Sequence, residues 1–296
     1  EELRILSAAY PDNADIREQL AMGVYNSFVS SEQEKAVQKR NELLDELRRL
    51  IVAYPGDAYI RQHFVKGLYN AFVDAHEEEN HQQSNKLFQE LRNLRITFPD
   101  DPVVRERLAR GLMYAISHAQ HVGGFQKVDD ILQELRNLRT AFPDDPAVRE
   151  RLSSGLFIAY NAQEKNDILK KNKFLQELRD LKTNYPDDSA VRKELAMALV
   201  NEYADAKTGN FLQRSKDILQ ELRDLRIAFP YDPVMRTELA IGLHNAVRCE
   251  NTIQRANVFL EELRELTTAY TQDTYIRDLF ESGYSFLLAR KKERGD

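Results

Sequence analysis

The spacing of proline residues is the feature that most constrains how this chain folds. Six of the 9 prolines follow an aromatic residue, and these six stand at positions 11, 55, 99, 143, 186 and 230. Successive members are therefore 44, 44, 44, 43 and 44 residues apart. The remaining prolines, Pro102, Pro146 and Pro233, each lie a few residues further on. Proline inside a helix costs about 3 kcal/mol, so the proline-free stretches allow long helices. The spacing predicts a tandem helical repeat.

Aspartates mark the beginning of each repeat. Six of them share one position in the period: Asp57, Asp101, Asp145, Asp188, Asp232 and Asp273. Three of the six precede a proline, and Asp followed by Pro is typical of a helix N-cap and first helical residue. This register sets full repeats at 14–57, 58–101, 102–145, 146–188, 189–232 and 233–273, with half repeats at 1–13 and 274–296.

Each repeat contains two apolar stripes with helical spacing. In the third repeat the first stripe consists of Val104, Leu108, Ala109, Gly111, Leu112, Ala115 and Ile116. The second consists of Ile131, Leu132, Leu135, Leu138 and Phe142. No segment alternates with a period of two, so we expect an all-α chain of antiparallel helix pairs. One pair cannot bury both stripes alone, so neighbouring pairs must stack into one solenoid domain over residues 1–296.

This pattern resembles the tetratricopeptide repeat (TPR), lengthened to 44 residues from about 34. The resemblance covers almost the whole chain and is carried in the third repeat by Arg105, Leu108, Ala109, Leu112, Ile131, Leu135, Leu138 and Pro143. Three positions depart from the family: Arg replaces Trp, Ala usually replaces a small Gly, and a large apolar residue replaces the second-helix Ala. The resemblance implies a right-handed superhelix that serves as an interaction scaffold.

Two basic patterns recur in every repeat. An arginine column comprises Arg17, Arg61, Arg105, Arg149, Arg192, Arg236 and Arg277. A Glu-Leu-Arg triplet recurs in the second helices, for example at 90–92 and 134–136. The arginines could present bidentate donors to an anionic ligand. Their presence in the terminal copies favours the alternative, an Arg–Glu ladder that joins helices and packs aliphatic stems over the core.

A glycine column predicts close contact between helices. It comprises Gly23, Gly67, Gly111, Gly155, Gly242 and Gly283, and only Ala198 interrupts it. A glycine in the middle of a helix costs about 1 kcal/mol relative to alanine. Its recurrence therefore indicates positions where a neighbouring helix leaves no room for a side chain.

The strongest candidate for a binding site lies just after the glycines. We define the first-helix strip as Tyr25, Asn26, Tyr69, Asn70, Asn201, His244 and Asn245. The corresponding part of the TPR faces the concave groove, so the resemblance implies that this strip faces a ligand. An Asn amide donates and accepts hydrogen bonds at once, and aromatic rings anchor apolar groups. The alternative is that the amides bond within their repeats and the rings belong to the core.

Signals of other chemistry are weak. His118 and His121 lie close in sequence, but without a carboxylate or cysteine nearby they indicate a surface pair rather than a metal site. Cys249 is the single cysteine and is expected to be a small buried residue. We recognise no phosphate-binding glycine loop, Ser/His/Asp signature or paired carboxylates. We therefore expect no enzyme activity, no cofactor and no metal.

Composition limits the partners. With 42 basic and 48 acidic residues the net charge is -6, which disfavours a dedicated nucleic-acid binder. No run of 18 apolar residues predicts a membrane span. The single cysteine and the absence of a recognisable signal segment point to a cytoplasmic location.

These observations predict a scaffold that binds a protein or peptide in the concave groove of a TPR-like superhelix. Two alternatives remain at this stage. The half repeats at both ends suggest a sensor or regulatory array within a longer chain. Local basic stripes would allow RNA binding, although the acidic balance makes this the weaker alternative.

Overall fold

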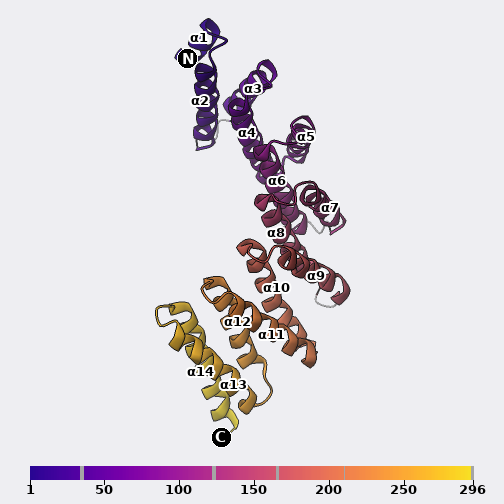
Figure 1. Cartoon of the computed structure of the whole chain (residues 1–296), viewed down its shortest axis with the longest axis vertical. Coiled ribbons are helices and arrows are strands. Elements are labelled where there is room, and N and C mark those ends of the chain that lie inside the picture. The colour runs from indigo at the N-terminus through magenta and orange to yellow at the C-terminus, as the bar shows by residue number, and fades with distance from the viewer. Residues whose placement is uncertain (34–36, 122–124, 165–166, 210, 295–296) are drawn as a thin grey trace. The chain divides into compact units, whose positions relative to one another are not determined.

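The computed structural model describes the chain except residues 34–36, 122–124, 165–166, 210 and 295–296 (Figure 1). The described residues form 14 α-helices and no strand, which confirms the all-α prediction. The chain divides into two compact units, residues 1–151 and 152–296. Consecutive helices pack in pairs, as expected for a helical repeat.

The first unit contains a short helix followed by three helix pairs. Its helices are α1 (Glu2–Ala9), α2 (Ala14–Gln33), α3 (Val37–Ala53), α4 (Ala58–Glu77), α5 (His81–Thr97), α6 (Pro102–His121) and α7 (Phe125–Ala141). The next helix, α8 (Pro146–Ala162), begins in this unit and ends in the second.

The second unit continues the alternation. Its helices after α8 are α9 (Ile168–Asn184), α10 (Ser189–Thr208), α11 (Leu212–Ala228), α12 (Pro233–Cys249), α13 (Ile253–Ala269) and α14 (Thr274–Arg294). The even-numbered helices are the first helices of the repeats and the odd-numbered ones from α3 onward are the second helices.

Aspartate caps set where the first helices begin. Asp101 Oδ1 accepts hydrogen bonds from the backbone amides of Val103 at 2.8 Å and Val104 at 3.2 Å. Equivalent caps form at Asp57, Asp145, Asp188, Asp232 and Asp273. A side-chain acceptor at this position satisfies backbone donors that have no partner within the helix. All six predicted caps are confirmed, and Pro102, Pro146 and Pro233 each open a helix.

First helices pack directly on one another within each unit. In the first unit α2 contacts α4 and α4 contacts α6, and in the second α10 contacts α12 and α12 contacts α14. The second helices α3, α5, α11 and α13 each pack between the first helix of their own repeat and that of the next, as α3 does between α2 and α4. In the first unit Figure 1 shows α3, α5 and α7 on the same side of α4 and α6.

The two apolar stripes of each repeat form the core. In the third repeat Val104, Leu108, Leu112 and Ile116 of α6 are buried. Leu132, Leu135 and Leu138 of α7 are buried as well. Because these side chains share one face of each helix, the hairpin buries them only by packing against its neighbours.

Members of the glycine column lie against a neighbouring second helix. A Cβ atom on Gly111 would lie 2.9 Å from Phe88 Cε2 of α5, and one on Gly242 would lie 3.0 Å from Leu222 Cδ1 of α11. In both cases the neighbour is the second helix of the preceding repeat. The predicted close approach is confirmed at these two positions and at Gly67, where the nearest atom lies at 3.3 Å, and it explains the cost of glycine there. At Gly23 and Gly283 the nearest atoms, at 3.5 and 3.4 Å, leave room for ordinary contact with a Cβ.

Candidate functional site

The arginine column connects adjacent repeats. Arg61 of α4 donates from Nε to Asp101 Oδ2 at 2.5 Å, and from Nη1 to the carbonyl oxygen of Pro55 at 3.2 Å. Its guanidinium carbon lies 4.4 Å from the ring centroid of Phe98. Asp101 is the N-cap of the next first helix, so one guanidinium joins the end of one repeat to the start of the following repeat.

The same arrangement recurs along both units. Four further arginines stack on the aromatic residue before a turn and pair with the capping aspartate that follows it: Arg17, Arg105, Arg192 and Arg236. The nearest N–O distances in these four pairs range from 3.1 to 3.7 Å. These groups are therefore structural, but their acidic partner is Asp rather than the Glu predicted from the sequence.

The glutamates belong to a second, separate ladder on the second helices. Arg48 of α3 forms two hydrogen bonds to Glu90 of α5, at 2.8 and 2.7 Å. Further bridges of the same kind are Arg4–Glu46, Arg92–Glu134, Arg179–Glu221 and Arg223–Glu262. Each joins a Glu-Leu-Arg triplet to the equivalent triplet of the next repeat. The first-helix arginines and the second-helix glutamates therefore belong to two separate sets of ion pairs.

In the first unit, the first-helix strip combines accessible amides with half-buried rings. Asn26 is exposed, whereas Tyr25, Tyr69 and Asn70 are half-buried. The ring of Tyr25 lies 5.5 Å from that of His63 on α4. Within the described residues, the side-chain amides of Asn26 and Asn70 have no hydrogen-bond partner in the protein. These amides are free to bind a ligand, while the rings are held between neighbouring first helices.

In the second unit the strip is less uniform. Asn201 is exposed, and its Nδ2 donates to Asn161 Oδ1 on α8 at 2.8 Å. Asn245 is half-buried. His244 is buried, with Nε2 3.3 Å from Ser282 Oγ of α14, and burial lowers the pKa of this imidazole. Asn201 and Asn245 are therefore the accessible groups here, and His244 lies between helices.

A histidine cluster lies at the end of α4. Of its members, only His118 was named in the sequence analysis. The ring centroids of His76 and His118 are 3.9 Å apart, and His81 lies 6.4 Å from His76. His76 Nδ1 lies 2.9 Å from Ser84 Oγ. The predicted neighbour of His118, His121, has its side chain outside the described residues. His76 was missed because it lies 42 residues from His118 in sequence. Over the described residues no group of three His, Cys, Asp or Glu side chains is arranged to hold a metal ion.

Cys249 differs from the expectation. It is exposed, not buried. Cys249 is the last residue of α12 and lies next to the exposed Arg248, whereas the following Glu250 is buried. The helical period placed Cys249 near apolar residues, but the period does not show which residues at the end of a helix are buried by neighbouring helices.

Comparison with known proteins returns no match among protein-family models, curated proteins or solved structures. Among the described residues, no helix combines the length and apolar character needed to cross a membrane.

Proposed function

We propose that this chain is a TPR-like scaffold, not an enzyme, and that it binds a protein or peptide along the first helices, on the concave face of a right-handed superhelix. The observation that carries the proposal is the recurrence of accessible amides at one position of the first helices. Asn26 and Asn70 provide them in the first unit, and Asn201 and Asn245 in the second.

The chemistry of these amides matches a peptide backbone. Each Asn side chain donates through its NH₂ group and accepts through its oxygen, so it complements the C=O and N–H groups of an extended chain. Asn26 and Asn70 occupy the same register position on directly packed helices, α2 and α4. An extended peptide crossing these helices would meet one amide per repeat.

Contacts between repeats position the helices that carry the strip in the absence of a partner. The Arg–Asp bridges and the aromatic stacking at Arg17 and Arg61 fix the starts of α2 and α4 relative to the next repeat. Tyr25 and Tyr69 are likewise confined by their neighbours. A preorganised surface loses little conformational freedom when it binds, which favours affinity.

Selection from a phage-displayed peptide library on the immobilised chain tests the proposal. We expect enrichment of peptides that bind in solution and compete with one another. Capture from native lysate with and without ribonuclease distinguishes the RNA alternative. Ribonuclease-sensitive capture together with no enriched peptide would contradict the proposal.

A further inference from the structure

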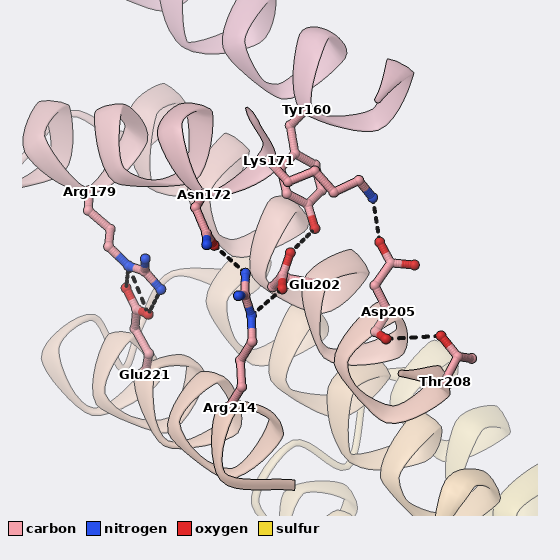
Figure 2. A network of polar contacts seen from close by, with 9 residues as sticks. All are labelled: Tyr160, Lys171, Asn172, Arg179, Glu202, Asp205, Thr208, Arg214 and Glu221. Carbon is pink, nitrogen blue, oxygen red and sulfur yellow. Dashed lines mark hydrogen bonds and ion pairs between the residues drawn. The ribbon is translucent and has the colours of Figure 1, made fainter. Parts of the chain in front are cut away.

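A buried polar network in the second unit provides the starting point (Figure 2). Tyr160 Oη of α8 donates to Glu202 Oε2 at 2.5 Å, and Arg214 Nε of α11 pairs with Glu202 Oε1 at 2.5 Å. Arg214 also donates to Asn172 of α9. Glu202 is only 4% exposed, so its carboxylate depends on these donors for the hydrogen bonds it loses from water.

One repeat later, the same positions carry the donors without the carboxylate. Asn201 and Asn245 share a register position, so Tyr203 corresponds to Tyr160 and Ala246 to Glu202. The triplets beginning at Glu221 and Glu262 align in the same way. Arg255 therefore corresponds to Arg214, since each stands 7 residues before its triplet. Ala246 thus replaces the acceptor that a tyrosine and an arginine share in the preceding repeat.

The consequence is visible at Tyr203. This side chain is 1% exposed, and its buried Oη has no hydrogen-bond partner among the described residues. A buried hydroxyl without a partner destabilises the fold, so its retention requires an explanation. Burial, with Glu250 nearby, raises the pKa of Tyr203, so the phenol stays protonated and remains a donor.

The surrounding charges also change. Lys171 and Asp205 form an ion pair at 2.5 Å. In the next repeat Ser215 stands at the position of Lys171 and Cys249 at the position of Asp205, so both charges are lost. Asn172 corresponds to Lys216, which adds a positive charge.

A cavity of about 580 Å³ opens at this place, bounded by α10, α11 and α13. Tyr203, Lys216 and Arg255 line it, together with the apolar side chains of Leu212, Val258 and Phe259. Its volume falls in the range of about 300–1,000 Å³ that small-molecule sites occupy.

Charge pairing leaves an excess of positive charge at this cavity. Three lining ions already have a partner: Lys207 and Glu250 pair with each other, and Arg223 pairs with Glu262. Asp217 accepts a hydrogen bond from the neutral Gln213 and keeps its negative charge, so it offsets one of the remaining cations. Within the described residues, the side chains of Lys216 and Arg255 form no ion pair.

We propose that this cavity is a binding site for a carboxylate attached to an apolar body. The carboxylate would take the place that Glu202 has in the preceding repeat, accepting from Tyr203 Oη and Arg255, with Lys216 adding positive charge. The apolar body would lie against Leu212, Val258 and Phe259. A carboxylate is favoured because the chain itself places one between the equivalent tyrosine and arginine, and because charge-assisted hydrogen bonds are stronger than neutral ones. Lys216 and Arg255 lie at the exposed mouth of the cavity, and the Tyr203 hydroxyl lies at its buried end.

This site is separate from the first-helix strip. It is bounded by second helices α11 and α13 and by Tyr203 of α10, and it contains no strip residue. Failure of one proposal would therefore leave the other standing.

Calorimetric titration of the full chain with 4-phenylbutyrate and with its primary amide tests the site. We expect saturable binding of the acid and at least about tenfold weaker binding of the amide. N-acetyl-alanyl-phenylalanine, which carries its carboxylate on a peptide terminus, forms a second arm. Tighter binding of this dipeptide than of the free acid would identify the carboxylate source as a peptide end, and the reverse order would identify a free acid.

Variants locate the binding. Ala246→Glu restores the internal carboxylate, and we expect it to weaken 4-phenylbutyrate binding by at least about tenfold while preserving or raising thermal stability. Tyr203→Phe should weaken binding severalfold without a loss of stability. Tyr160→Phe is the matched control and should leave 4-phenylbutyrate affinity unchanged. No saturable binding of either carboxylate at millimolar concentration, equal binding of acid and amide, or undiminished binding by folded Ala246→Glu would overturn the proposal.

Discussion

Arg61 Nε lies 2.5 Å from Asp101 Oδ2, while the other oxygen of the same carboxylate caps the helix that begins at Pro102. Asp101 is therefore the last residue of one repeat, the N-cap of the next repeat's first helix, and the ion-pair partner of the arginine in its own repeat. This double use explains why the aspartate and arginine positions recur together along the chain.

Asp101→Ala should lower the free energy of unfolding by more than a helix cap alone contributes, which is about 0.5–2 kcal/mol. The variant loses the cap and also leaves the half-buried Arg61 without its carboxylate. Urea unfolding monitored by circular dichroism measures the difference. Asp100→Ala, at the exposed neighbouring position, is the control and should change stability little. Equal effects of the two substitutions would contradict the double role.

Gly111→Leu should destabilise the first unit by about 1–3 kcal/mol, because overpacking forces helices apart. Even a Cβ atom at this position meets the ring of Phe88 at 2.9 Å. Gly56→Leu is the matched control, since a Cβ there has no neighbour within 4 Å. Thermal melting of both variants compares them, and an unchanged Gly111→Leu melting temperature would show that the close approach does not matter.

Two tyrosines at one register position should respond differently to loss of the hydroxyl. Tyr160→Phe removes a donor from the buried Glu202 and should cost about 1–3 kcal/mol. Tyr203→Phe removes a hydroxyl that has no partner in the described protein and should cost nothing or stabilise slightly. Chemical denaturation of the two variants measures the contrast. Similar losses in both would mean that Tyr203 Oη has an acceptor in solution.

His76 should make the chain sensitive to acid. Burial, and then the neighbouring His118 and His81, lower its pKa below the ordinary 6.5, while Glu77 opposes the shift. As the pH falls below 6.5, His76 becomes protonated in the unfolded chain but stays neutral in the folded chain. The free energy of unfolding therefore decreases with falling pH until the pH is below the pKa of His76 in the folded chain.

His76→Gln should reduce this acid-induced loss. The free energy of unfolding of the parent and of the variant is measured at about pH 7.5 and at about pH 5. The difference between the two proteins at the higher pH gives the effect of losing the contact with Ser84 alone. A variant that loses as much stability on acidification as the parent would assign the sensitivity to other groups.

The sequence predicts the helices well because helix ends depend on local chemistry. Asp-Pro pairs and capping aspartates report the start of a helix within a few residues, and Asp101, Asp145 and Asp232 all mark one in the structure. The glycine column was equally informative, since a costly residue at a fixed position implies a steric reason.

Partnerships between repeats were harder to predict. The spacing showed that Arg61 and Glu90 recur, but not that Asp101 lies closer to Arg61 than any glutamate does. The cluster of His76 with His118 and the unpaired hydroxyl of Tyr203 depend on which helices meet, and no local pattern reports that. Alignment of the repeats would have shown Ala246 opposite Glu202, but its significance appears only beside the cavity.

The affinity of the Asn70→Ala, Asn201→Ala double variant for a selected peptide tests the proposed scaffold function most directly. Asn70 has no side-chain partner among the described residues, and Asn201 would lose one exposed hydrogen bond, to the side chain of Asn161. Their loss should therefore disturb the fold little. We expect binding more than about tenfold weaker, or about 1.4 kcal/mol, with a nearly unchanged melting curve. Asn93→Ala with Asn137→Ala, on exposed faces of the second helices, should retain full affinity. Unchanged affinity of the first variant, or equal losses in both, would contradict the assignment of the partner to the first helices.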